Sequence, residues 1–434
     1  MNIQQLKKDY KARIIDGQMQ KYLRAFGAVC IDGPKWCGKT WTSFYHSKSA
    51  IFLDSPDNNF QNRRLAEISP ALVLEGDTPR LIDEWQEVPA LWDAVRHTVD
   101  DRAAKGQFIL TGSSTPKNNT DSKDAGKHHS GAGRMGKLRM STMSLYETGE
   151  SSGVVSLHDL CEGKFIPAMT GNVSLKDLTK YVVRGGWPGN IGADGDIMGL
   201  LPSSYIETIL SDDTQRIDDI KYDTHKMRML LMSLARNEST TATKSKLISD
   251  ITEHTATRID DDTVATYLDV FERLYIIDNQ PAYSANLRSS VRLKQAPKRH
   301  FCDPSLACAL LKATPERLIG DLNTFGFMFE SLCEHDLKIY AQSFGGQLFH
   351  YQDYKNREID AVIELPDGKW CAFEIKLGEN QVDKAAEGLI ALRDSIVAEG
   401  GVAPSVLGVI CGLTSAAYQR PDGVYVVPIT ALKD

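Results

Sequence analysis

The chain of 434 residues lacks any apolar run of about 18 residues, the length that a membrane-spanning helix needs. Its first eight residues contain charged and amide side chains instead of an apolar core followed by a small-residue cleavage site. We therefore expect no signal peptide and no membrane partner. A cytoplasmic protein fits both absences.

Paired cysteines and an excess of positive charge are also lacking. The eight cysteines are scattered singly and none forms Cys-x-x-Cys, which argues against a zinc site or a redox pair. The formal net charge is −7 at pH 7. A general electrostatic attraction for nucleic acid is therefore excluded, and any contact with DNA must come from a local patch.

What the chain does have is a glycine-rich segment, 33–40, that fits the phosphate-binding pattern G-x-x-x-x-G-K-[ST]. It follows an apolar segment, 28–31, that predicts a strand, and precedes a segment that predicts a helix from Lys39 onward. In that setting the backbone N–H groups point at a β-phosphate, so the sequence predicts an ATP site. The predicted binding residues of this segment are Gly33, Pro34, Lys35, Trp36, Cys37, Gly38, Lys39, Thr40 and the following Trp41.

An acid pair supplies the second half of this predicted site. Lys39 is expected to contact the β- and γ-phosphates, and the Thr40 hydroxyl to bind Mg²⁺. The apolar segment 79–83 ends at Asp83, which is expected to bind nucleotide by holding the Mg²⁺ shell through water. Glu84 is the predicted catalytic base that orients and deprotonates the attacking water. An acidic junction on a surface would look the same, but its place downstream of 33–40 favours catalysis.

Two further features belong to the same predicted site. Thr111 and Ser113 lie at the end of a predicted strand, where either side chain would face the γ-phosphate; an ordinary Gly-Ser turn is the alternative. Arg134 is the first candidate, and Arg139 the second, for an arginine that completes the site of a neighbouring subunit. This interpretation predicts a homo-oligomer, whereas a plain surface arginine would not.

Alternating strand and helix signals over the first 150 residues predict an α/β fold with a parallel sheet. The strands are expected at 28–32, 51–54, 71–74, 79–83 and 107–112. The expected domains are a P-loop ATPase domain at 1–150, a helical lid or connector at 151–225, a winged-helix domain at 226–315 and a further α/β domain at 316–434.

The winged-helix prediction rests on helical patterns at 227–236, 244–251 and 263–274, followed by wing strands at 275–277 and 299–302. A candidate phosphate-contacting patch consists of Arg288, Arg292, Lys294, Lys298 and Arg299. The acidic run 260–262 at the start of the third helix would repel DNA. DNA binding through 263–300 and protein docking therefore both stay open.

A hairpin near the C-terminus brings acidic residues together. The segments 357–364 and 369–376 flank a Pro-Asp-Gly sequence at 366–368, which suits a three-residue loop closed by a left-handed glycine. Counting back from that loop places Asp360 directly opposite Glu374. Side chains that are directly opposed share one face of the hairpin.

This face predicts metal chemistry. Asp360 and Glu374 could share one Mg²⁺ or Mn²⁺, and Lys376 on the same face could polarise water or phosphate. The arrangement Asp…Glu-x-Lys resembles the core of the PD-(D/E)XK nucleases, whose first helix often adds a glutamate that Glu330 matches here. A solvent-facing hairpin is the alternative, and it predicts an ion pair between Lys376 and Glu358.

The chain as a whole resembles the prokaryotic AAA+ ATPases that carry a C-terminal domain of unknown function (4143). The residues that carry the resemblance are 33–40, 81–86, 110–113, 130–134, 144–147, 185–188, 358–360 and 374–376. The resemblance implies ATP binding, an AAA+ core, a winged-helix middle and a nuclease-like end. We therefore expect an oligomeric, Mg²⁺-dependent ATPase that acts on DNA, with an ATP switch that binds a protein partner, and does not cleave, as the alternative.

Overall fold

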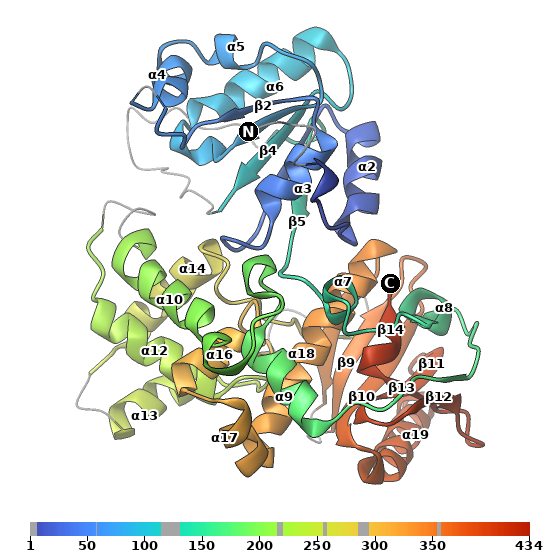
Figure 1. Ribbon diagram of the computed structural model, residues 1–434. Helices are drawn as coiled ribbons and strands as arrows, with labels where there is room; N and C mark the ends of the chain where they lie inside the picture. The colour runs from blue at the N-terminus through green and yellow to red at the C-terminus, as the bar shows by residue number, and fades with distance from the viewer. Residues whose placement is uncertain are drawn as a thin grey trace. The chain divides into compact units, whose positions relative to one another are not determined.

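The computed structural model describes residues 7–57, 59–113, 131–214, 220–254, 258–284, 295–353 and 357–434 (Figure 1). The chain forms two compact units. The first unit comprises Met1–Thr142, Asp212–Lys221 and Val270–Ile276, and the second comprises Met143–Ser211, Tyr222–Asp269 and Ile277–Asp434. In the described ranges, no helix combines the length and apolar character that crossing a bilayer would take.

The first unit contains a five-stranded sheet in which every neighbouring pair of strands is parallel, in the order β2-β3-β4-β1-β5. The strands are β1 (Ala28–Asp32), β2 (Ser49–Phe52), β3 (Arg80–Asp83), β4 (Phe108–Gly112) and β5 (Met135–Arg139). The helices are α2 (Ile15–Ala25), α3 (Lys39–His46), α4 (Gln61–Ile68), α5 (Pro70–Val73) and α6 (Ala90–Arg102). The parallel α/β architecture expected from the sequence is therefore confirmed.

Both faces of this sheet are buried, because successive side chains of a strand point to opposite sides. Ala28 and Cys30 of β1 pack into one core together with α6, whereas Val29 and Ile31 pack into a second core with α2 and α3. This double burial explains why β1 is a continuous apolar run.

The strand expected at 71–74 was wrong, because residues 71–73 belong to helix α5 and Leu74 caps its C-terminal end. Ser69 is extended and Pro70 occupies the first helical position, a combination that favours the start of a helix. A short apolar run does not by itself distinguish a buried strand from a buried turn of helix.

The second unit is built around a seven-stranded mixed sheet in the order β7-β12-β13-β11-β10-β9-β8. Its strands are β7 (Ala168–Met169), β8 (Gln347–Gln352), β9 (Glu358–Glu364), β10 (Trp370–Gly378), β11 (Val406–Leu413), β12 (Ala416–Gln419) and β13 (Tyr425–Pro428). Helix α19 (Val382–Ala398) packs on Val409 and Cys411 of β11. Helix α18 (Leu322–Ser343) covers the opposite face, where its Phe329 lies against Gly412.

Short strands from the segment after residue 150 join this C-terminal part. Strand β7 pairs with β12, and β6 (Val155–Ser156) pairs with β14 (Leu432–Lys433). The other helices of this unit are α7 (Leu145–Thr148), α8 (Leu157–Cys161), α9 (Leu175–Arg184), α10 (Leu200–Thr208), α12 (Thr224–Arg236), α13 (Lys244–His254), α16 (Pro304–Leu311) and α17 (Pro315–Gly320), while α14 (Asp261–Arg273) contributes to both units.

The three helices expected between 226 and 275 are present as α12, α13 and α14. An antiparallel bridge joins Ile277 to Phe301, where the wing strands were expected, and a second bridge joins Gln280 to Lys298, just outside the expected ranges. Asp260 accepts a hydrogen bond from the Thr263 backbone at 2.8 Å and so caps α14. The elements agree with the sequence prediction, while the winged-helix class itself stays a prediction.

Candidate functional site

The glycine-rich segment forms the loop between β1 and α3. Gly33 has φ +153° and Gly38 has φ +107°, both in the region that disfavours other residues. A Cβ atom at position 33 would lie 2.2 Å from the Met140 carbonyl oxygen, so the strand β1 can leave the sheet here only through glycine. These two positions fix the course of the loop.

The backbone of this loop presents N–H groups that no described residue uses. Lys35 and Trp36 lie in the loop, and Lys39 and Thr40 begin α3; none of these backbone N–H groups donates to an acceptor within the described ranges. The N–H groups of a first helical turn have no partner inside the helix. Together with the positive end of the α3 dipole they make a site suited to phosphate.

Lys39 is buried inside the loop that it is predicted to serve. Its ammonium donates hydrogen bonds to the carbonyl oxygens of Gly33 at 2.9 Å and Pro34 at 2.8 Å. Arg13 braces the loop from outside, because its guanidinium donates to the Cys37 carbonyl at 2.8 Å and to the Ser141 carbonyl at 2.9 Å. The role of Arg13 was missed, since nothing in its local sequence links it to residue 37.

The strand order brings the predicted magnesium ligands together. Because β4 lies between β1 and β3, the carboxyl ends of the three strands meet at one edge of the sheet. Thr111 donates a hydrogen bond to Asp83 at 2.6 Å, and the Thr40 hydroxyl lies beside the same carboxylate. Burial raises the pKa of Asp83 to about 6, and these hydrogen bonds oppose the rise. A cation would favour the charged carboxylate.

Glu84 follows Asp83 directly and has a left-handed backbone conformation with φ 56°. Its backbone N–H donates to the Thr111 hydroxyl at 3.1 Å, and its carboxylate accepts a hydrogen bond from Ser113 at 3.0 Å. Gln86 also donates to this carboxylate and to Ser113. The sequence left open whether Thr111 or Ser113 serves the site; in the structure Thr111 positions Asp83 and Ser113 contacts Glu84. Gln86 had no predicted role.

The two candidate arginines lie at opposite ends of strand β5. Arg139 is paired in register with Asp32, at the end where β1 leads into the loop, and its guanidinium lies 4.7 Å from the centre of the Tyr275 ring. Arg134 precedes β5 at the other end, where it is half-exposed and forms a 2.6 Å ion pair with Asp100. Arg134 therefore does not reach the loop of its own chain, and both a role in a neighbouring subunit and a plain surface arginine stay open.

The C-terminal hairpin has the register that the turn predicted. Leu365 donates a hydrogen bond to the Lys369 carbonyl at 2.8 Å, and Phe373 pairs with Ala361, so the next pair along is Asp360 and Glu374. Gly368 has φ +85°, as expected for the left-handed position of the loop. The geometric prediction is confirmed.

Lys376 joins the two acids. Its ammonium lies 3.1 Å from Asp360 and 2.6 Å from Glu374. The alternative, an ion pair with Glu358, was wrong, because Glu358 accepts a 2.6 Å hydrogen bond from Gln352 instead. Asp360, Glu374 and Lys376 therefore lie on one face of the hairpin, as predicted.

The metal predicted at this face does not fit the structure. Glu330 lies close to Asp360, but the ammonium of Lys298 contacts Glu330, Glu334 and the backbone oxygen of Asp360. Among the described residues, no group of three or more His, Cys, Asp and Glu side chains is placed to hold a metal ion. The nucleotide site differs, since two protein ligands and the phosphates of the nucleotide commonly suffice for Mg²⁺.

The basic patch proposed for DNA is corrected in part. Lys298 and Arg299 are only 7% and 8% exposed, so neither is available to a phosphate on the surface. Lys298 is held by carboxylates, and Arg299 donates to the Ala242 carbonyl at 3.1 Å. Arg288, Arg292 and Lys294 lie outside the described residues.

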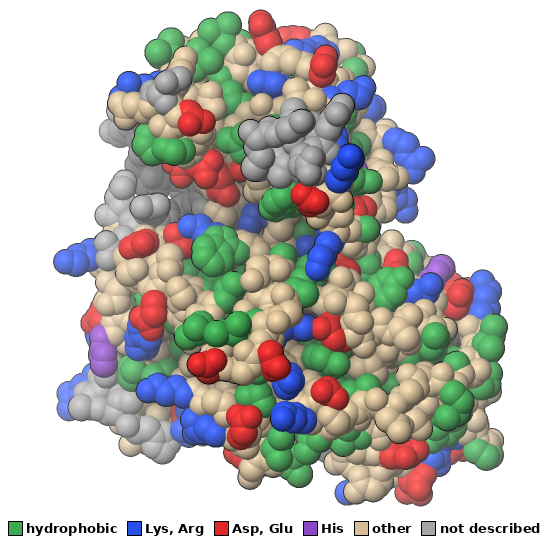
Figure 2. All heavy atoms as spheres, viewed as in Figure 1, with side chains coloured by type: hydrophobic (Ala, Val, Ile, Leu, Met, Phe, Trp, Pro, Cys, Tyr) green, Lys and Arg blue, Asp and Glu red, His purple; other side chains and the backbone are tan. Residues whose placement is uncertain are grey.

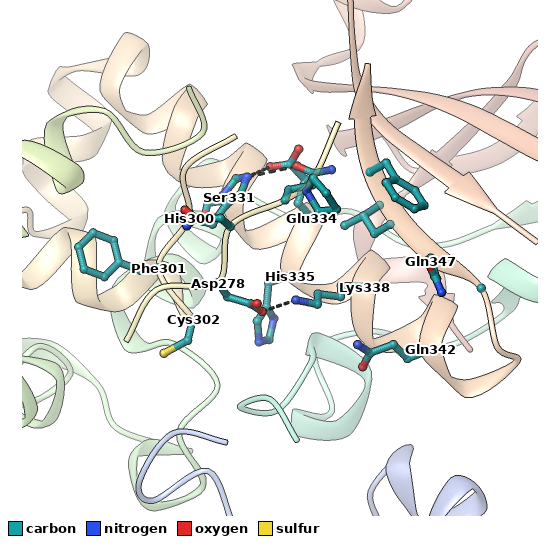
Figure 3. A pocket seen from close by; sticks show the side chains of 16 residues that line it. Asp278, His300, Phe301, Cys302, Ser331, Glu334, His335, Lys338, Gln342 and Gln347 are labelled. Carbon is teal, nitrogen blue, oxygen red and sulfur yellow. Dashed lines mark hydrogen bonds and ion pairs between the residues drawn. The ribbon is translucent and has the colours of Figure 1, made fainter. Parts of the chain in front are cut away.

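A buried histidine extends this ionic network, and Figure 3 shows His300 pointing toward Glu334 at the wall of a pocket. The ring nitrogens of His300 lie 3.0 Å from Glu334 and 3.2 Å from Glu238, and Gln280 lies beside it. Burial alone would lower the pKa of His300, but the two carboxylates raise it to about 9.

This pKa predicts a loss of stability in alkaline solution. The folded state keeps the proton of His300 up to about pH 9, whereas the unfolded chain releases it near pH 6.5. The contribution of protonated His300 to the free energy of unfolding is therefore complete below pH 6.5 and is lost as the pH rises to 9. This contribution is at most about 3 kcal/mol. Urea titrations at both pH values should show a larger drop for the wild type than for His300→Gln. An equal drop would contradict the assignment.

A parallel sheet with a glycine-rich loop between β1 and α3, and with Thr40 beside Asp83, has the architecture of a P-loop domain. Comparison with family models agrees: residues 25–149 match the model described as an AAA domain. Residues 175–317 match a domain of unknown function (DUF8612), and residues 325–432 match a second one (DUF4143). The chain therefore carries an AAA domain at its N-terminal end and a DUF4143 domain at its C-terminal end.

Relatives extend over most of the chain. The uncharacterized proteins Rv2008c of Mycobacterium tuberculosis and Mb2031c of Mycobacterium bovis are each 24% identical over 371 residues, which cover 83% of this chain and 72% of the relative. Two solved structures are also similar. The Walker-type ATPase PABY2304 of Pyrococcus abyssi is 12% identical with a TM-score of 0.42, covering 70% of this chain and 97% of its own. The replication initiator DnaA bound to AMPPCP and single-stranded DNA is 8% identical with a TM-score of 0.27, covering 61% and 91%.

Proposed function

We propose that this protein binds ATP together with Mg²⁺ at the loop 33–40 and hydrolyses it. The observation that carries the proposal is the meeting of Thr40 and Asp83 beside the unused N–H groups of the loop. Thr40 and Asp83 would hold the Mg²⁺, which neutralises charge on the phosphates. Lys39 would stabilise the γ-phosphate, and Glu84, aimed by Ser113 and Gln86, would take a proton from the attacking water.

Phosphate release from ATP tests this proposal. Purified protein should release phosphate from ATP in the presence of Mg²⁺, and this release should stop when EDTA removes the metal. The same assay should include single-stranded, duplex and branched DNA, because a DNA partner that is coupled to ATP hydrolysis will change the rate of phosphate release. No release under any of these conditions would refute the proposed activity.

We also propose that the protein acts as a homo-oligomer in which Arg134 reaches the site of a neighbouring subunit. Its position supports this, because Arg134 lies at the end of β5 opposite its own loop and forms an ion pair with the half-exposed Asp100. An arginine supplied in this way stabilises charge on the transferred phosphoryl group.

Mixing two inactive variants tests the role of Arg134. Arg134→Ala and Lys39→Ala should each turn over ATP poorly, for different reasons. In a mixture, some interfaces will combine an intact loop with an intact Arg134, so part of the turnover should return. Mixing Arg139→Ala with Lys39→Ala provides the matched comparison. Recovery only in that second mixture would transfer the role to Arg139, and no recovery in either would remove it.

ATP hydrolysis is proposed to reposition a DNA-binding or DNA-processing part formed by 263–300 and the C-terminal domain. DNA as the partner is supported by the helices α12 to α14 and by the hairpin that joins Asp360, Glu374 and Lys376. Other observations favour the alternative, an ATP switch for a protein partner. Lys298 and Arg299 are buried, and on the face shown in Figure 2 basic and acidic side chains are interspersed. Stimulation of phosphate release by DNA would favour the DNA-binding or DNA-processing role over the protein switch.

A further inference from the structure

In the second unit, two basic residues of an extended segment lie against two glutamates of helix α18. Lys298 and His300 are two residues apart on a segment that pairs as a strand, which places their side chains on one face about 6.5 Å apart. Glu330 and Glu334 are four residues apart on α18, and such side chains are neighbours about 6 Å apart. Lys298 contacts both glutamates, and His300 contacts Glu334.

The ammonium of Lys298 stays charged although it is buried. Burial disfavours the charge, but Glu334, Glu330 and Asp360 together raise the pKa of Lys298 above its ordinary value. The ion pairs of Lys298 with Glu330 and Glu334 therefore already bring a cation to these buried carboxylates.

Carboxylate and imidazole side chains, which are ligand types for divalent cations, line the cavity around Lys298. A cavity of about 260 Å³ is lined by Lys298, Glu330, His350 and Asp360, among others. His350 is 3% exposed, and its Nε2 atom has no hydrogen-bond partner in the described part of the chain. The other ring nitrogen interacts with the Ala296 carbonyl, an arrangement that leaves Nε2 able to bind a metal.

We propose that the ammonium of Lys298 stands where a divalent cation would otherwise bind between Glu330, Asp360 and His350. The C-terminal carboxylates consequently hold no metal in this protein, and the hairpin that carries Asp360 and Glu374 does not support metal-dependent cleavage. The inference is independent of the ATPase proposal, because it concerns the second unit and can be tested without nucleotide.

Manganese binding to nucleotide-free protein tests this proposal, with Mn²⁺ titrated and its free fraction followed by electron paramagnetic resonance. The wild type should show no Mn²⁺ binding that depends on Asp360. Lys298→Met should gain a site for about one ion per chain, because removal of the ammonium leaves oxygen and nitrogen ligands facing one cavity. Combining Lys298→Met with Asp360→Asn should abolish the gain.

The controls keep the test decisive. Lys298→Arg keeps the positive charge and should bind no Mn²⁺, and Lys369→Met removes an exposed lysine of the same hairpin and should behave as the wild type. Lys298→Gln supplies a second neutral variant should the methionine variant unfold. Asp360-dependent Mn²⁺ binding by the wild type would overturn the proposal, as would the absence of any gain in a folded, neutral Lys298 variant.

Discussion

Replacing Lys39 by alanine is expected to lower ATP turnover by at least about 100-fold, the size of effect seen when one preorganised donor to a transition state is removed. The ammonium of Lys39 is buried and donates hydrogen bonds to the carbonyl groups of its own loop, so the substitution removes a positive charge that the fold holds at the start of α3. Phosphate release under saturating ATP measures turnover, and calorimetric titration with ATP shows how much binding is lost.

Lys21→Ala is the matched control, because Lys21 is an exposed lysine of α2 outside the site. It should keep wild-type turnover. If Lys39→Ala turns over ATP as the wild type does, the loop 33–40 is not the site of hydrolysis and the assignment of Thr40 and Asp83 falls with it.

Replacing Glu84 by glutamine is expected to slow hydrolysis by roughly 10²–10⁴-fold while ATP stays bound. Glutamine keeps the size of the side chain and can still bond to Ser113, but it cannot accept the proton of the attacking water. Single-turnover measurements separate this step from binding. Intact ATP should remain on the variant after the wild type has converted it to ADP.

Glu87→Gln offers the same chemical change a few residues away, where Glu87 pairs with Arg63 at 2.7 Å. It should hydrolyse ATP normally. Normal hydrolysis by Glu84→Gln as well would assign the base to another residue, with the nearby Asp83 as the next to test.

The local parts of the site were predictable because each depends on a few adjacent residues. Gly33 and Gly38 occupy backbone conformations that favour glycine, and Asp83 ends an apolar strand, so the pattern itself encodes the loop and the acid pair. The pairing of Asp360 with Glu374 followed in the same way, since a turn of known length fixes the register of its hairpin.

The contacts that the sequence did not reveal all join distant segments. Arg13 reaches the Cys37 carbonyl, and Lys298 reaches α18, through the tertiary fold alone. Lys298 looked like part of a basic surface because several arginines and lysines surround it in the sequence. Only the antiparallel pairing of Lys298 with Gln280 places its side chain in the interior, among carboxylates.

Binding of ATP to the loop 33–40 is the central claim, and calorimetric titration of the nucleotide-free protein with a non-hydrolysable ATP analogue in Mg²⁺ tests it most directly. We predict saturable binding of about one analogue per chain, lost in Lys39→Ala and weakened when EDTA removes the metal. Absence of binding by the folded wild type, or equal binding by Lys39→Ala, would contradict the claim.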